Sequence, residues 1–240
     1  MTNDLRPAIW AHRGASGNFV ENTRAAFEGA RAEGADWVEL DVRLTRDGSL
    51  IVHHDSAYSD GRGVWATAST DRPESVLTLQ EALVSCAGMG VNIEIKNSPG
   101  DLGDASEQGD GAVPHDLEVA DAVVEVAVGS GVEVLISSFD EPTLARVRSL
   151  SPRLATGFLV FDLNADPTLP ERAADAGDAA VHPWDPFVDA AFMERCRNLG
   201  LAVNPWTIDA EDRILELSRL GVDAVITNFP QRTRSILGRS

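Results

Sequence analysis

Ionisable residues of the kinds that bind metals and transfer protons gather at the ends of predicted strands in the first part of the chain. They are His12 and Arg13, Glu39 and Asp41, His54 and Asp55, and Glu94 and Lys96. Alternate side chains of a strand point to the same face, so two residues spaced two apart project together. The spacing therefore predicts one polar cluster to which several strands contribute.

Three carboxylates of this cluster, Glu39, Asp41 and Glu94, would repel one another in a partly dry site unless a cation neutralised them. A bound divalent ion provides that neutralisation. Oxygen ligands without thiolates or a pair of imidazoles favour a hard ion over zinc. We therefore expect one divalent cation, Mg²⁺ or Ca²⁺, and these residues leave both ions open.

Lys96 is the only lysine among the 20 lysines and arginines of the chain. A compact ammonium differs in geometry from the guanidinium fork of an arginine. Its place in the cluster indicates a geometric demand at a phosphate or a metal-bridged oxygen, and chance is the alternative.

Short apolar or β-branched runs alternate with amphipathic segments along the chain, as in repeated βα units around a parallel sheet. The strand candidates are Ala8–Gly14, Trp37–Leu44, Val91–Lys96, Val134–Phe139, Ala155–Val160, Ala179–Trp184, Leu201–Thr207 and Ala224–Thr227. The helix candidates are Thr23–Glu33, Leu79–Ala87, Asp116–Val128, Glu141–Leu150, Leu169–Ala176, Val188–Leu199, Ala210–Leu220 and Gln231–Leu237. Eight such units predict a closed (β/α)₈ TIM barrel, whose site forms at the C-terminal ends of the strands.

A further strand-like run, Ser49–His54, follows Trp37–Leu44 too closely for a helix to intervene. Asp47-Gly48 between the two runs is a strong hairpin signal, so we expect an antiparallel excursion. Asn22 is expected to cap the first helix. Residues 97–114 are acidic and glycine-rich and predict a mobile polar loop on the substrate side.

Length and composition indicate one globular domain over residues 1–240, with 43% hydrophobic and 24% charged residues. The net charge of −18 argues against nucleic-acid binding and against stable association with anionic membranes. No signal peptide or membrane-spanning run is evident, so a cytoplasmic location is expected. Cys86 and Cys196 form no disulfide framework and are expected to be buried thiols.

A linked set of motifs then resembles the glycerophosphodiester phosphodiesterases, in order and in spacing. The motifs are His12-Arg13-Gly14, Glu21-Asn22-Thr23, Glu39-Leu40-Asp41-Val42, Thr45-Arg46-Asp47-Gly48, Val52-His53-His54-Asp55 and Asn92-Ile93-Glu94-Ile95-Lys96. The resemblance continues more weakly through Ser137-Ser138-Phe139, Asn204-Pro205-Trp206-Thr207 and Ile226-Thr227-Asn228-Phe229-Pro230. One HRG tripeptide would mean little, whereas the linked set is specific.

The resemblance implies a TIM barrel that binds one divalent metal ion and hydrolyses small glycerophosphodiesters to sn-glycerol 3-phosphate and an alcohol. Carried over by position, His12 and His54 are the expected catalytic residues. Glu39, Asp41 and Glu94 are the expected metal ligands, and Arg13 and Lys96 the expected phosphate contacts. Such histidines would act as general acid and base, and the cations would stabilise phosphoryl charge. The oligomeric state stays open.

Several other residues have two interpretations. His53 is expected to be structural, because strand alternation points it away from His54. Asp55 either orients a site residue or ends its strand. Glu21 either positions Arg13 or, slightly favoured, stabilises the start of a helix. Trp206 and Phe139 are expected to line the substrate pocket, with core packing as the alternative for Trp206.

Two positions depart from the family's pattern, and two other functions compete. Asn228 stands where the family usually has Asp, and Pro205 occupies a strand position where the family commonly has a β-branched or aromatic residue. We expect both to affect the pocket without touching the metal or histidine set.

His182 is expected to be a satisfied core residue. The competing functions are a lysophospholipase D-like phosphodiesterase, which an exposed apolar rim including Phe187 or Phe192 would support, and a non-catalytic phosphate- or metal-binding barrel.

Overall fold

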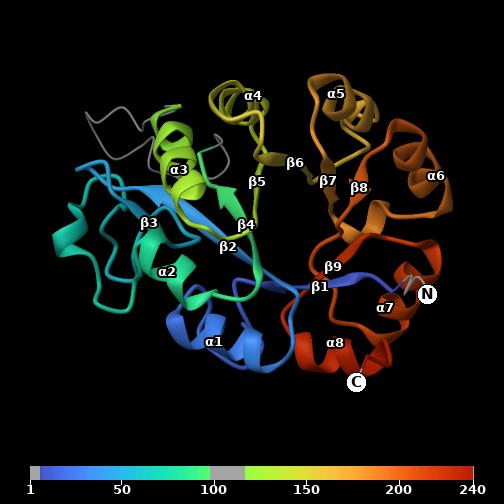
Figure 1. Ribbon diagram of the computed structural model, residues 1–240, viewed down its shortest axis with the longest axis horizontal. Helices are drawn as coiled ribbons and strands as arrows, with labels where there is room; N and C mark the ends of the chain where they lie inside the picture. The colour runs from blue at the N-terminus through green and yellow to red at the C-terminus, as the bar shows by residue number, and fades with distance from the viewer. Residues whose placement is uncertain (1–5, 98–116, 240) are drawn as a thin grey trace.

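The structure is a computed structural model that describes residues 6–97 and 117–239, in which helices surround a ring of strands (Figure 1). In these ranges the strands are β1 (Ala8–His12), β2 (Trp37–Leu44), β3 (Leu50–Val52), β4 (Gly90–Ile95), β5 (Val134–Ser138), β6 (Ala155–Val160), β7 (Ala180–Pro183), β8 (Ala202–Val203) and β9 (Ala224–Thr227). The α-helices are α1 (Arg24–Ala32), α2 (Leu79–Ser85), α3 (Glu118–Gly129), α4 (Glu141–Leu150), α5 (Leu169–Ala176), α6 (Ala190–Leu199), α7 (Glu211–Leu220) and α8 (Pro230–Ile236). Short 3₁₀ turns, η1 and η3, cover Ser69–Asp71 and Asp185–Phe187.

The strands form one sheet in the order β8-β7-β6-β5-β4-β2-β1-β9, with every neighbouring pair parallel. Only β3 lies off this path among the described strands, pairing antiparallel with β2 so that Val52 opposes Val42. The TIM barrel and the hairpin at Asp47-Gly48 are thereby confirmed.

The ring closes between the short strand β8 and β9. Val203 O accepts from Asp223 N at 3.0 Å, Pro205 O accepts from Ile226 N at 3.1 Å, and Ile226 O accepts from Ile208 N at 2.8 Å. The predicted strand Leu201–Thr207 is reduced to Ala202–Val203. Pro205 explains this in part, because proline has no N–H to donate to a ladder.

Two apolar layers hold the ring. Between strands and helices lies the larger cluster, which includes Phe27, Leu40 and Ile93. Inside the ring lies a smaller one, in which Trp10 stacks on Trp37 with ring centroids 4.9 Å apart. Gly90 leaves space for the indole of Trp37, because a Cβ at residue 90 would come within 2.3 Å of that ring.

Some expectations change at the ends of elements. Thr23, not Asn22, caps α1, with Thr23 Oγ1 accepting from Ala26 N. The predicted polar loop at 97–114 lies outside the described residues except for Asn97. Both cysteines are buried, and burial raises the pKa of each thiol to about 12. Within the two described ranges, no helix combines the length and apolar character needed to cross a membrane.

Candidate active site

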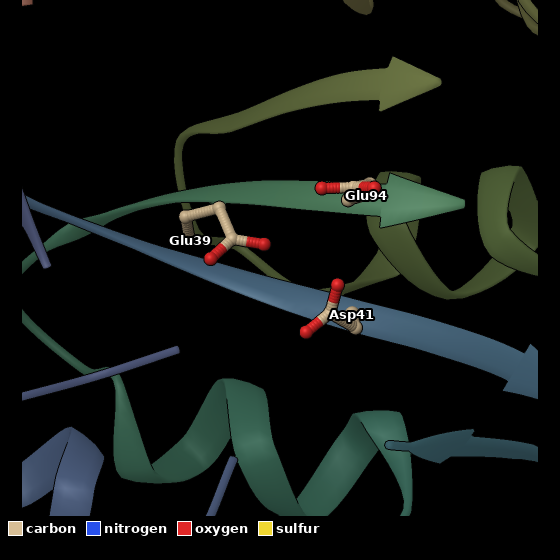
Figure 2. A group of neighbouring side chains, drawn as sticks. All are labelled: Glu39, Asp41 and Glu94. Atoms are coloured by element: carbon tan, nitrogen blue, oxygen red, sulfur yellow. The ribbon is translucent and has the colours of Figure 1, made fainter. Parts of the chain in front are cut away.

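The three predicted metal-binding carboxylates meet on two neighbouring strands. Figure 2 shows Glu39 and Asp41 on β2 and Glu94 on the adjacent β4. Asp41 lies opposite Glu94 in the parallel register, so the period-two spacing of β2 places both of its carboxylates beside that residue. One ligand oxygen from each lies within 4.8 Å of the others, and all three residues are buried.

The donor set fits a hard divalent cation. Glu39 Oε1 is buried and, among the described residues, has no hydrogen-bond partner. Burial and the repulsion of Asp41 and Glu94 raise the pKa of Glu39 well above its usual value. Burial opposes ionisation of Asp41 as well, but the nearby Lys96 and Arg13 charges outweigh it and lower the pKa of this carboxyl to about 2. A cation bound among the three oxygens would compensate the charge of Glu39.

Two basic side chains border the carboxylates. Arg13 Nε lies 3.2 Å from Asp41 Oδ2, and its backbone N–H donates to Glu39 Oε2 at 2.8 Å. Lys96 Nζ contacts Glu94 and lies 3.4 Å from Asp41 Oδ1. The cluster thus combines three acids with two bases, an arrangement in which a phosphate and a divalent ion can bind side by side.

The turn after β1 aims Arg13 at this cluster. Arg13 and Gly14 both have positive φ, of 55° and 81°, and a Cβ on residue 14 would lie 2.6 Å from the Ala26 backbone. The guanidinium NH1 donates to both Glu21 oxygens at 3.0 Å, which favours a positioning role for Glu21, and the first turn of α1 contains no acidic residue. Asn22, also with positive φ, donates to Asp41 Oδ2 at 2.8 Å.

The histidine pair after β3 divides as strand alternation predicts. His54 lies beside the cluster, its Nδ1 is 2.8 Å from Asp55 Oδ1, and its carbonyl accepts from the Arg43 guanidinium at 2.6 and 2.9 Å. His53 instead has its Nε2 3.1 Å from Ala57 O and packs against the Tyr58 ring. Asp55 therefore contacts a site residue.

A cavity of about 200 Å³ joins most of the predicted residues. Its lining contains His12, Arg13, Glu39, His54, Glu94, Lys96, Phe139 and Trp206 from the predicted set, together with Asn92, Leu159, His182 and Ile226. Asp41 is not in the lining but holds Arg13, Lys96 and Asn22 at its edge. Asn92 had a signal in the sequence, since it lies two before Glu94 on β4 and so shares its face.

His182 is buried as expected but only partly satisfied. Its Nε2 lies 3.2 Å from Asn204 Nδ2, whereas Nδ1 is buried with no partner among the described residues. Burial lowers the pKa of this imidazole to about 3, so it stays neutral at neutral pH.

Asn228 contradicts the expectation that it stays clear of the histidines. Its Oδ1 lies 2.8 Å from His12 Nδ1 and 2.8 Å from Ser16 Oγ, while its Nδ2 donates to Asp209 Oδ2 at 2.7 Å. The cause is topological, because β9 pairs with β1 and places the ends of the two strands side by side. Burial and the nearby Arg13 charge lower the pKa of His12, so the neutral imidazole is favoured.

Comparison with known proteins agrees with this geometry. The glycerophosphoryl diester phosphodiesterase family matches residues 12–232, and the chain belongs to that family of phosphoric diester hydrolases. It is 29% identical to glycerophosphodiester phosphodiesterases of Bacillus altitudinis, over 95% of this chain and 97% of the relative, and of Caldanaerobacter subterraneus, over 95% and 96%. A phosphodiesterase structure from Oleispira antarctica, in complex with its product sn-glycerol 3-phosphate, superimposes with a TM-score of 0.84 at 28% identity, covering 98% of both chains.

Proposed function

We propose that this enzyme hydrolyses small glycerophosphodiesters, such as glycerophosphocholine or glycerophosphoethanolamine, to sn-glycerol 3-phosphate and an alcohol. The proposal depends on one observation: a single cavity joins two histidines, buried acidic residues and the basic side chains of Arg13 and Lys96. The bound product of the Oleispira antarctica relative supports the same choice. Against a purely binding function, two histidines border the same cavity, His12 from β1 and His54 from the segment after β3.

In the proposed mechanism Arg13 and Lys96 bind the phosphoryl oxygens and offset their negative charge. Glu39, Asp41 and Glu94 would hold one Mg²⁺ or Ca²⁺, which supplies further charge stabilisation when bound. His12 and His54 exchange protons with the attacking and leaving oxygens, a task for which the imidazole side chain is suited. Asp55, in contact with His54 Nδ1, orients that ring.

The neighbouring histidines provide a matched test of this mechanism. Purified protein is assayed for glycerol 3-phosphate release from both diesters with Mg²⁺, with Ca²⁺ and with a chelator. We expect His54→Gln and His12→Gln each to lower kcat by about 10²- to 10⁴-fold, the usual contribution of a general acid or base. His53→Gln, which changes a histidine that contacts Ala57 instead, should retain most of the activity. Release that persists under chelation and in His12→Gln would contradict the proposal.

An exposed aromatic rim favours a second candidate, hydrolysis of a lysophospholipid. Phe161 and Trp184 are 57% and 39% exposed and stack with ring centroids 5.1 Å apart. Phe161 also lies 6.3 Å from the ring of Trp206, which lines the cavity, and Phe187 packs edge-on against Trp184. Phe192 is buried and takes no part. An apolar surface therefore extends outward from the cavity, where an acyl chain would be shielded from water.

The two candidates separate on substrate preference. The double variant Phe161→Ala/Trp184→Ala is compared with the parent on lysophosphatidylcholine and on glycerophosphocholine, with the exposed Val84→Ala on α2 as a control. If the rim binds an acyl chain, kcat/KM falls about tenfold for the lysophospholipid, in line with the loss of one large apolar contact, and is unchanged for glycerophosphocholine. An equal effect on both substrates, or no effect, excludes the acyl-chain role.

A further inference from the structure

Asn228 forms a bridge between His12 and a carboxylate that lies outside the cavity lining. Asn228 Oδ1 lies 2.8 Å from His12 Nδ1, and Asn228 Nδ2 donates to Asp209 Oδ2 at 2.7 Å. Asp209 is itself held by Asn228 N and Thr227 Oγ1, which both donate to its Oδ1 at 2.9 Å. The order is therefore imidazole, amide, carboxylate.

The carboxylate decides which way the amide faces. An ionised carboxylate only accepts hydrogen bonds, so the NH₂ group of Asn228 has to face Asp209. The amide oxygen must then face His12. Because that oxygen also only accepts, the proton of the neutral imidazole has to lie on Nδ1, which leaves the lone pair on Nε2.

Ser16 gives the amide oxygen a second fixed neighbour. Ser16 Oγ lies 2.8 Å from Asn228 Oδ1 and 2.7 Å from the carbonyl oxygen of His12, and its single proton is donated to one of these two acceptors. Whichever oxygen accepts this proton, Ser16 is hydrogen-bonded either to the backbone of His12 or to the amide that contacts its imidazole.

We propose that Asn228, oriented by Asp209, is a positioning residue that holds His12 in the Nδ1–H tautomer and so makes Nε2 the atom that exchanges protons with the substrate. The inference rests on the proposed acid–base role of His12 for its consequence in catalysis. The tautomer itself follows from the hydrogen-bond geometry alone.

An amide suits this position better than a carboxylate would. The site already contains the buried acids Glu39, Asp41 and Glu94 close to His12, and a carboxylate at position 228 would also face Asp209 at hydrogen-bond distance. Like charges so close repel strongly. Asn228 orients the ring without adding charge, while polarisation by Asp209 strengthens its oxygen as an acceptor.

The test reads the tautomer directly by ¹⁵N NMR of histidine-labelled protein, with the His12 signals assigned by their loss in His12→Gln. In the parent we expect Nδ1–H and an unprotonated Nε2 at pH values where His12 is neutral. In Asp209→Asn the new amide can donate as well as accept, so Asn228 is free to turn over and the Nε2–H form gains population. Asp209→Glu keeps an accept-only group and should keep the parent tautomer.

Activity supplies the second measurement. Asp209→Asn and Asn228→Ala should each lower kcat by about tenfold or more, with KM within about threefold, because ring orientation and not substrate binding is affected. Asp189→Asn makes the same charge change at the N-cap of α6, where asparagine caps equally well, and should leave both the tautomer and kcat unchanged.

The outcomes separate the two levels of the inference. An unaltered His12 tautomer in both Asp209→Asn and Asn228→Ala overturns it, and Asn228→Ala decides alone if Asp209→Asn does not fold. If neither diester is hydrolysed by the parent, the proposed function fails while the NMR result still decides the positioning role. If the tautomer changes but kcat does not, the claim that Asn228 contributes to catalysis through His12 is overturned.

Discussion

Two neighbouring carboxylates on one strand differ in their tendency to ionise. Lys96 and Arg13 outweigh burial at Asp41 and lower its pKa to about 2, whereas burial and its acidic neighbours raise the pKa of Glu39. The difference follows from position, since Asp41 contacts both basic side chains, while among the described residues Glu39 accepts only the backbone N–H of Arg13. Of these two predicted metal ligands, Glu39 is therefore the one whose charge more needs a bound cation.

Replacing Glu39 should separate stability from metal binding. We expect Glu39→Gln to raise the Tm of the metal-free protein by ~2–4 °C, as about 1 kcal/mol does in a chain of this size, because it removes a buried like charge. The same variant should lose the Tm rise that Mg²⁺ or Ca²⁺ gives the parent. Differential scanning calorimetry with and without each ion measures both effects. Glu28→Gln, an exposed residue of α1, is the control, and an undiminished metal-induced rise in Glu39→Gln would contradict the ligand assignment.

At the scale of elements, the β2–β3 hairpin matters most, because it brings His54 back to the cavity. Its turn is held by Asp47, which accepts from Thr45 Oγ1 at 2.6 Å, Ser69 N at 2.9 Å and Ser69 Oγ at 2.8 Å. These hydrogen bonds lower the pKa of Asp47 to about 2. The segment that follows β3 is thereby fastened to the hairpin turn.

The pH dependence of Asp47→Asn tests this fastening. A carboxyl whose pKa is lower in the folded state stabilises the fold above its unfolded pKa of about 4 and loses that effect as the pH falls toward 2. We therefore expect Asp47→Asn to lower Tm at pH 6 and to match the parent near pH 2. Thermal unfolding across this range measures the difference, with the exposed Asp175→Asn of α5 as the control. A Tm difference that does not change with pH would rule out the charge as its cause.

At the scale of the whole molecule, the ring of strands encloses a neutral imidazole. His182 on β7 packs edge-on against Trp10 of β1, with ring centroids 5.5 Å apart, across the interior of the ring. A Cβ at residue 157 would come within 2.5 Å of His182 Nε2, so Gly157 on the neighbouring strand β6 leaves space for the imidazole. Burial lowers the pKa of this imidazole to about 3, so the enclosed side chain is neutral at neutral pH.

His182 should make the whole fold sensitive to mild acid. Its folded pKa of about 3 lies below the unfolded value of 6.5, so the unfolded chain binds the proton first and stability falls as the pH drops through this window. We expect His182→Gln to flatten the fall in unfolding free energy between pH 6 and pH 5 by up to about 1.4 kcal/mol per pH unit. Urea unfolding at each pH measures the slope, and His53→Gln is the control. Parallel slopes in His182→Gln and the parent would contradict the prediction.

Features that depend on local patterning could be predicted from the amino-acid sequence. Short apolar or β-branched runs between amphipathic segments predicted eight barrel strands, Asp47-Gly48 predicted the hairpin, and the two-apart spacing on β2 predicted a shared face for Glu39 and Asp41. These features follow from backbone geometry over a few residues, so the residue types within a short segment are enough to predict them. The linked motifs predicted the family, which comparison confirms over residues 12–232.

Contacts between residues far apart in the chain could not be predicted and emerge from the folded structure. Asn228 meets His12 across 216 positions because closing the ring pairs β9 with β1, and no local pattern records which side chains then touch. The same holds for two other contacts. The ring closes through a hydrogen bond to Pro205 O, and Asn22 binds Asp41 instead of capping α1. Both depend on three-dimensional packing, because the local sequence allows many possible partners for a side chain and only the folded chain brings one of them into contact.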